Sequence, residues 1–283
     1  MKKNLILTLG LIGLTLATVS CGDDNDNHMD YTRERTWNVE LLNHVCNTAD
    51  SATTTAATAS INTQKVVYRF TSDMANLTFN PTLVATVGGT ERQYSLTGVA
   101  GANSEDHPNV YSFADKGVGD MSNFSGKIDF MDQNIYWNYL AEGKYKVIST
   151  LPTISTSSNT VTKSVWTDTT STHTTPMTSF AIDPASMKAT FTLNMYTNVK
   201  IPRTYQSITA KNADVAITNN GYHITGNGFN ATATYMTSAS SKLQTTTLEI
   251  NNLDAIIDVE NNAIYVTFNM AGARVTVNGT IYI

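Results

Sequence analysis

"IDFMDQNIYWNYLAEG" at residues 128–143 and "IDVENNAIYVTFNMAG" at residues 257–272 are two versions of one segment, 129 positions apart. Five of the sixteen positions are identical, where average residue usage gives about one. "YSLTG" at residues 94–98 and "YHITG" at residues 222–226 match at nearly the same separation. Matches in one order at one spacing predict an internal duplication. The alternative is that two unrelated sets of strands reuse the same Thr, Ile and Tyr residues.

The segments around these matches alternate between apolar and polar residues. Such a period of two is typical of antiparallel strands with one buried face, and the turn residues in "VENN" predict a hairpin. The residues predicted to share a buried face are Ile264, Val266, Phe268 and Met270; Met187, Ala189, Phe191, Leu193 and Met195; and Val275, Val277, Ile281 and Ile283.

These patterns predict an all-β, antiparallel protein of two similar domains, each a β-barrel or a β-sandwich. We expect a first β domain at residues 36–150, a Ser/Thr-rich linker at residues 151–160 and a second β domain at residues 161–283. One stretch stays ambiguous. "TWNVELLNHVCNTA" at residues 36–49 has apolar residues at both helical and strand spacing.

The N-terminus has the layout of an export signal. Two lysines are followed by about 15 uncharged, apolar or small residues, at positions 5–19, and small residues precede a junction. The apolar stretch is shorter than the roughly 20 residues that a membrane-spanning helix needs. We therefore expect residues 1–20 to be a signal peptide and residues 21–35 to be an acidic tether.

The junction "TVSC" ends in Cys21 and resembles a bacterial lipobox of the relaxed kind found in Bacteroidetes lipoproteins. This resemblance implies that Cys21 carries lipid chains, which anchor firmly when two or more are present. The next residues resemble the acidic tag that sends such lipoproteins to the cell surface, through Asp23, Asp24 and Asp26. It implies an outer-membrane protein on the cell surface, with the periplasmic face as the alternative.

The strand ends "YSLTG" and "YHITG" and the Asp-containing hairpins extend this resemblance. Together with the leader, they resemble lipocalin- or calycin-like lipoproteins of Bacteroidetes, here in tandem. The resemblance implies barrel-shaped domains in a tethered protein that binds a ligand.

Composition limits the partners. From Tyr31 onward the chain has 16 Lys and Arg against 19 Asp and Glu, a formal charge of −3. A chain without an excess of cations has no surface to neutralise phosphates, so we expect no nucleic-acid partner. With Cys21 lipidated, Cys46 has no partner for a disulfide, and we interpret it as a small buried apolar residue.

The sequence has no pattern that supports catalysis. The five histidines lack the spacing of a metal site, and no nucleophile or phosphate-binding motif occurs. Asp129 and Asp258 recur in the two halves, next to hairpins, and we interpret them as turn-capping or solvated residues rather than as a catalytic pair. We therefore expect no enzyme activity, no metal and no cofactor.

Two groups of residues have candidate roles. Trp137 and Tyr139 fall on one face of a strand in "NIYWNYL" and could contact a sugar or an apolar ligand; the alternative is an ordinary core. "DSA" and "DTT" resemble the O-glycosylation sequon of exported Bacteroidetes proteins, which implies glycans on Ser51 and Thr169, in loops.

Three classes of function follow. The leading hypothesis is a surface-tethered, non-enzymatic lipoprotein that binds a glycan or a small apolar ligand. The alternative is a structural or adhesive subunit, resembling fimbrial lipoproteins, or a protein-interaction module. In that case the C-terminal strand at residues 275–283 would pair with a neighbouring protein. An enzyme is the third class, and nothing in the sequence favours it.

Overall fold

The two repeated segments fold as equivalent β-hairpins. Asp129 pairs with Asn134 in the first, and 129 residues later Asp258 pairs with Ala263 in the second. The Asp258 carboxylate accepts hydrogen bonds from the backbone N and the side-chain Nδ2 of Asn261, at 2.9 and 2.8 Å. These two hydrogen bonds confirm the turn-capping interpretation of Asp258.

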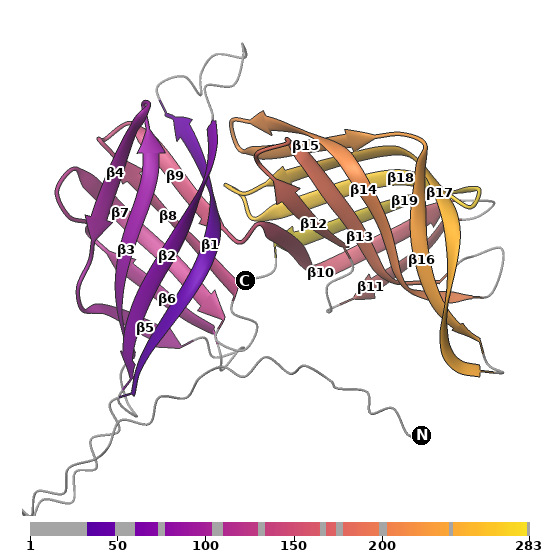
Figure 1. Ribbon diagram of the computed structural model, residues 1–283, viewed down its shortest axis with the longest axis horizontal. Helices are drawn as coiled ribbons and strands as arrows, with labels where there is room; N and C mark the ends of the chain where they lie inside the picture. The colour runs from indigo at the N-terminus through magenta and orange to yellow at the C-terminus, as the bar shows by residue number, and fades with distance from the viewer. Residues whose placement is uncertain are drawn as a thin grey trace, which may run out of the picture. The chain divides into compact units, whose positions relative to one another are not determined.

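The rest of the chain has the same character. The computed structural model describes residues 33–48, 60–72, 77–103, 110–129, 134–164, 168–173, 178–197, 203–237 and 240–281. Within these ranges the regular elements are all β-strands (Figure 1). The predicted all-β, antiparallel class is confirmed.

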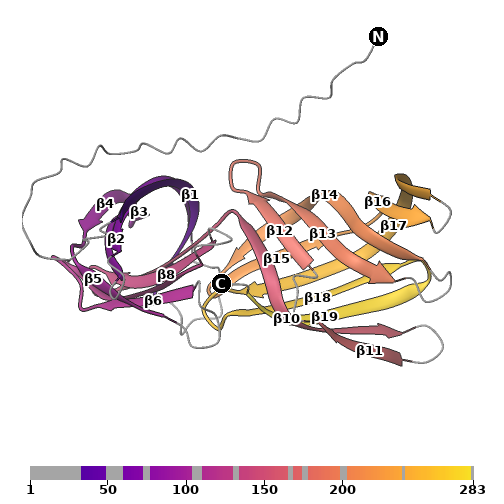
Figure 2. The same cartoon turned by 90° about the horizontal axis from the view of Figure 1, so that it is seen from below.

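The first lobe, β1 to β9, is one antiparallel sheet in the order β2-β1-β9-β8-β7-β6-β5-β3-β4. Its strands are β1 (Arg33–Asn47), β2 (Ser60–Ser72), β3 (Leu77–Val87), β4 (Thr90–Ser95), β5 (Val99–Asn103), β6 (Val110–Asp115), β7 (Met121–Asp129), β8 (Asn134–Ala141) and β9 (Tyr145–Thr150). An additional pairing of β2 with β3 closes eight of these strands into a barrel, and β4 extends from β3 as an arm. Figure 2 shows β1 to β3 curving round to complete this closure.

The second lobe, β10 to β19, follows the same plan in the order β11-β10-β12-β13-β14-β15-β17-β18-β19. Its strands are β10 (Thr153–Ser164), β11 (Asp168–His173), β12 (Thr178–Asp183), β13 (Lys188–Thr197), β14 (Thr204–Thr218), β15 (Gly221–Gly226), β16 (Phe229–Thr237), β17 (Ser240–Asp258), β18 (Ala263–Met270) and β19 (Ala273–Ile281). The pairing of β10 with β19 closes this sheet, and β16 pairs with β14 and β17. Each lobe is therefore a barrel rather than a sandwich of two separate sheets.

Both lobes have the same irregularity at the same place. The β7–β8 ladder slips within residues 122–125, and the β17–β18 ladder slips within residues 251–254, again 129 positions on. Each bulge contains an asparagine in the left-handed region, Asn123 with φ 57° and Asn252 with φ 52°, a conformation that asparagine tolerates better than most residues. The matched bulges support the predicted internal duplication.

Within the described residues, the predicted buried faces pack in the core of the second lobe with one exception, and Ile283 lies outside those residues. Phe191 and Val266 are 0% exposed, and Phe268 is 1% exposed. The predicted face of β13 is correct up to Leu193 but wrong at Met195, which is 56% exposed. Met195 has a φ of 50°, and this left-handed residue shifts the alternation so that the next side chain, Tyr196, is buried instead.

The ambiguous stretch at residues 36–49 lies mostly in strand β1. Alternation fails at residues 41–46 because both faces of this part of β1 are buried. Leu41 and Val45 pack in the core of the first lobe, whereas Leu42 packs with the core of the second lobe. A strand that is buried on both faces has a continuous apolar run, and periodicity alone does not separate it from a helix.

Two predicted boundaries are wrong. Residues 153–160 are not a linker, because β10 begins at Thr153 and pairs with β12 and β19. Thr is β-branched and suits a strand, so a Ser/Thr-rich run can be a strand as easily as a linker. The tether also ends earlier than residue 35, because β1 begins at Arg33 and pairs with β2.

The residues from Thr32 to Ile283 form one compact unit, and His44 is central to the contact within it. This side chain is 1% exposed. Its Nε2 donates to the Thr218 carbonyl at 2.8 Å, and its ring meets Tyr222 edge-on at 5.7 Å. Nδ1 is buried and has no hydrogen-bond partner, so His44 is neutral, with its proton on Nε2.

This contact predicts a pH-dependent stability. Burial lowers the pKa of His44 below its ordinary value of 6.5; the Thr218 carbonyl and the carboxylates of Glu260 and Asp258 oppose the shift, and Lys146 adds to it. As the pH falls below 6.5, the unfolded chain takes up this proton before the folded chain does. Stability is therefore greatest above pH 6.5 and declines below it, by at most about 1.4 kcal/mol per pH unit from this group.

The measurement is the free energy of unfolding between pH 7.5 and pH 5. His44→Gln keeps a donor for Thr218 but does not titrate, so its profile should be flatter than that of the wild-type chain. Equal slopes for the two proteins would show that another group causes the pH dependence.

Candidate functional site

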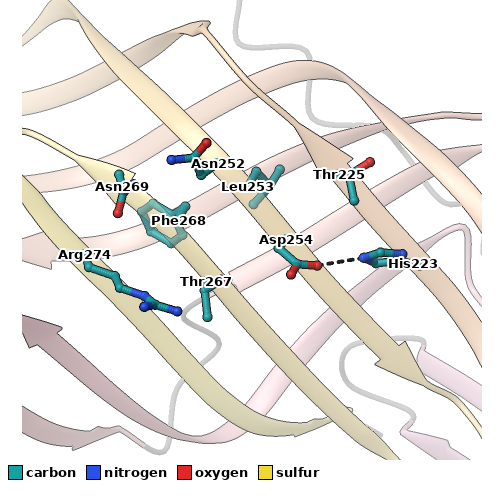
Figure 3. Close-up of a pocket in the computed structure, with 9 residues that line it drawn as sticks. All are labelled: His223, Thr225, Asn252, Leu253, Asp254, Thr267, Phe268, Asn269 and Arg274. Carbon is teal, nitrogen blue, oxygen red and sulfur yellow. Dashed lines mark hydrogen bonds and ion pairs between the residues drawn. The ribbon is translucent and has the colours of Figure 1, made fainter.

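The outer surface of the second lobe has a cleft of about 520 Å³ where β15, β17, β18 and β19 run side by side. Figure 3 shows the side chains that line it. They are His223 and Thr225 from β15, Asn252, Leu253 and Asp254 from β17, Thr267, Phe268 and Asn269 from β18, and Arg274 from β19. Seven of the nine carry a side-chain polar group, so the cleft is suited to hydrogen bonding.

The β17 bulge produces this cleft. Asn251 pairs with Asn269 and Asp254 pairs with Thr267, so two residues of β17 lie opposite Phe268 alone. A bulge of this kind bends its strand and re-aims the side chains next to it. Here it interrupts the flat outer surface of the barrel.

A hydrogen-bonded pair of side chains, His223 and Asp254, lies at one side of the cleft. The Nε2 atom of His223 is 2.7 Å from Oδ1 of Asp254, and the two side chains are 43% and 57% exposed. Exposed pairs contribute little to stability, so the fold does not depend on this one. The exposed side chain of Arg274 extends toward Thr267 (Figure 3), and the cleft therefore offers a carboxylate, a guanidinium and an imidazole close to amides and hydroxyls.

An apolar platform adjoins these polar groups. Ile256 and Tyr265 are cross-strand partners on the outer surface, 48% and 42% exposed. Ile256 also pairs with His223 across β15 and β17, so the platform lies beside the His223–Asp254 pair. An exposed tyrosine presents an apolar ring and a polar hydroxyl to the same ligand.

The first lobe uses the equivalent tyrosine differently. Tyr136 stands 129 positions before Tyr265, and its hydroxyl donates to the Val259 carbonyl at 3.0 Å. Burial is the main cause of the raised pKa of Tyr136. The fold thus uses Tyr136 for packing, while its counterpart in the second lobe is exposed to solvent.

The cationic side chain of the cleft, Arg274, also has a different environment from its counterpart in the first lobe, Lys146. Lys146 and Arg274 each stand one position after the first residue of the strand that follows the hairpin turn. Lys146 forms an ion pair with Glu260, whereas Arg274 lines the open cleft. The position of Asp254 is Ser125 in the first lobe, so the carboxylate of this pair has no counterpart there.

Trp137 and Tyr139 do not lie on the surface. Both are 1% exposed. The Trp137 ring packs between Phe79 and Phe124, with ring centroids 6.0 and 6.4 Å away, and Tyr139 meets Tyr94 at 5.8 Å. The alternative that the sequence left open, an ordinary core, is the one that the structure supports.

Of the other residues singled out from the sequence, some lie outside the described ranges and some lie within them. Cys21, Asp23, Asp24, Asp26 and Ser51 lie outside the described residues. Thr169 lies within strand β11, paired with Lys163, and not in a loop as expected. Cys46 is buried, as predicted.

Sequence reasoning missed the cleft. It found no pattern that links His223 to Asp254, whereas the structure places these two side chains within hydrogen-bonding distance. One signal was present: Tyr265 alternates with buried residues of β18, and therefore belongs to the outer face.

Comparisons with known proteins give no further constraint. No protein-family model, curated protein or solved structure matches this chain. Among the residues that the structure places, no three His, Cys, Asp or Glu side chains gather as a metal site. No helix in that part of the chain is long and apolar enough to span a membrane.

Trp137→Ala should therefore act on stability and not on ligand binding. Removing this ring from between Phe79 and Phe124 should lower the free energy of unfolding by about 3–5 kcal/mol, and Trp137→Phe should cost less. Denaturant unfolding measures both. An unchanged stability together with lost ligand binding would make Trp137 a ligand contact after all.

Proposed function

We propose that this protein is a non-enzymatic binding protein, held at the outer membrane by lipid on Cys21, and that its ligand is a glycan bound on the outer surface of the second lobe. One observation carries the proposal. Tyr265 is exposed beside a cleft lined with hydrogen-bonding side chains, whereas the hydroxyl of its counterpart Tyr136 is hydrogen-bonded to the Val259 carbonyl.

The chemistry of the cleft favours a glycan over a small apolar ligand. Hydroxyl groups of a sugar both donate and accept hydrogen bonds, and the carboxylate of Asp254, the guanidinium of Arg274 and the amides of Asn252 and Asn269 offer matching partners. A sugar ring has an apolar face as well, which suits the ring of Tyr265. The barrel interiors, by contrast, are filled with large side chains such as Trp137, Phe191 and Phe268.

The anchor is the second part of the proposal. It rests on the resemblance of "TVSC" to a lipobox and of the acidic run after Cys21 to a surface-export tag. A lipid-tethered protein at the cell surface would hold its cleft where extracellular glycans reach it. The periplasmic face of the membrane is the alternative location.

A structural or adhesive subunit is less well supported. That function would use the C-terminal strand to pair with a neighbour, yet β19 already pairs with β18 on one side and with β10 on the other. Its backbone donors and acceptors are thus engaged within the second lobe.

The test uses the mature, lipidated chain in detergent, first on a glycan array and then by calorimetry with the glycans that bind. Tyr265→Ala should weaken binding at least tenfold, about 1.4 kcal/mol, because it removes the apolar platform. Asp254→Asn should weaken it as well, because it removes the carboxylate that a sugar hydroxyl would bind. Tyr265→Phe should keep most of the affinity.

Leu243→Ala is the matched control, since Leu243 is 61% exposed but does not line this cleft. Thermal unfolding shows that each variant is folded. Binding that survives both Tyr265→Ala and Asp254→Asn would place the ligand elsewhere. A chain that binds no glycan on the array would contradict the proposed function.

A further inference from the structure

A second cleft of about 650 Å³ adjoins the first on the outer surface of the second lobe. It is lined by the loop at Asn227, by strands β17 and β18 and by the turn between β18 and β19; the lining residues are Asn227, Thr247, Leu248, Glu249, Asn251, Asn252, Asn269, Met270, Ala271 and Gly272. Asn252 and Asn269 line both clefts. The two clefts therefore meet at the β17 bulge, and we refer to them together as the groove.

The middle of this groove is held in place by two reciprocal hydrogen bonds. The backbone N of Gly228 donates to Oδ1 of Asn251 at 3.0 Å, and the backbone N of Asn252 donates to Oδ1 of Asn227 at 2.9 Å. The loop at Asn227 and the β17 bulge thus stabilise each other's conformation. A site that is ordered before binding loses less conformational entropy when a ligand arrives.

These hydrogen bonds also orient the two amides. Because each Oδ1 atom accepts a backbone N–H, the Nδ2 group of each amide is left to donate to a ligand. Thr247 and Glu249, both exposed on β17, add a hydroxyl and a carboxylate to the second cleft. The second cleft, like the first, is a hydrogen-bonding surface.

The size and charge of the groove define its ligand. A cleft of about 300–1,000 Å³ holds one small-molecule ligand, and each of these two clefts falls within that range. The groove has carboxylates at both ends, Asp254 and Glu249, against the single guanidinium of Arg274. It has no excess of positive charge to attract a polyanion.

We infer that the ligand is a neutral, linear oligosaccharide that lies along the whole groove and crosses the bulge at Asn252 and Asn269. One end of the chain contacts Asp254 and Arg274, and the other contacts Thr247 and Glu249. This inference rests on the proposed function and deepens it, because it specifies chain length and charge. A monosaccharide or a disaccharide fills only one cleft.

The test measures affinity against chain length by calorimetry, with the mature, lipidated chain. The probes are oligosaccharides of one to six units from four neutral series, α-1,4-linked glucose, β-1,4-linked glucose, mannose and xylose, and from one anionic series, oligogalacturonate. We expect a neutral series in which affinity rises at least tenfold between the disaccharide and the tetrasaccharide, as the second cleft becomes occupied.

Variants then separate the two clefts. The double variant Thr247→Ala, Glu249→Gln should abolish the gain in affinity between the disaccharide and the tetrasaccharide. Asp254→Asn should weaken ligands of every length. Thr245→Ala is the matched control, because Thr245 is exposed on the same strand but lines neither cleft.

The outcomes distinguish a failure of this inference from a failure of the proposed function. Equal affinity for disaccharide and hexasaccharide, with Asp254→Asn still damaging, would overturn the inference and leave the proposed function standing. Tighter binding of the anionic series would overturn the assignment of a neutral ligand. No binding in any series would contradict the proposed function itself.

Discussion

The closure of each sheet by one extra strand pairing is the constraint on which this structure depends. β2 pairs with β3 in the first lobe, and β10 pairs with β19 in the second. Closure satisfies backbone groups that an open sheet would leave at its edges, and it divides every strand into an inner and an outer face. The inner face becomes core, and the outer face becomes available for contacts with the other lobe or with a ligand.

The two lobes use the same outer face in opposite ways. In the first lobe, Tyr136 and Lys146 contact Val259 and Glu260 of the second lobe. In the second lobe, the counterparts of this tyrosine and this lysine are exposed at the groove. One copy of this surface therefore packs in the contact between the lobes, and the other copy is exposed to solvent. The bulge is present in both lobes, and in the second lobe its residues line the polar groove.

The interiors of the lobes have also diverged, with compensating changes in size. Gly126 lies opposite Trp137, and a Cβ atom at Gly126 would approach Trp137 Cβ to 2.7 Å. At the equivalent positions of the second lobe, Ala255 lies opposite Val266. The larger side chain of each pair faces the smaller one, which keeps both cores close to the packing density that stability requires.

The sequence alone determined the all-β class, the hairpins and the duplication, because these depend on local alternation, on turn residues and on a fixed spacing of 129 positions. It also determined most of the buried face of β13 and all of that face of β18. It failed where one left-handed residue, Met195, shifts the phase of a strand, and where both faces of a strand are buried, as in β1. Only the tertiary structure decided which strand pairings close the barrels, which tyrosine is exposed, and that His223, Asp254 and Arg274 meet at one cleft. The reason is that these features depend on pairings between residues far apart in the chain, and alternation along one strand reveals a face but not what lies against it.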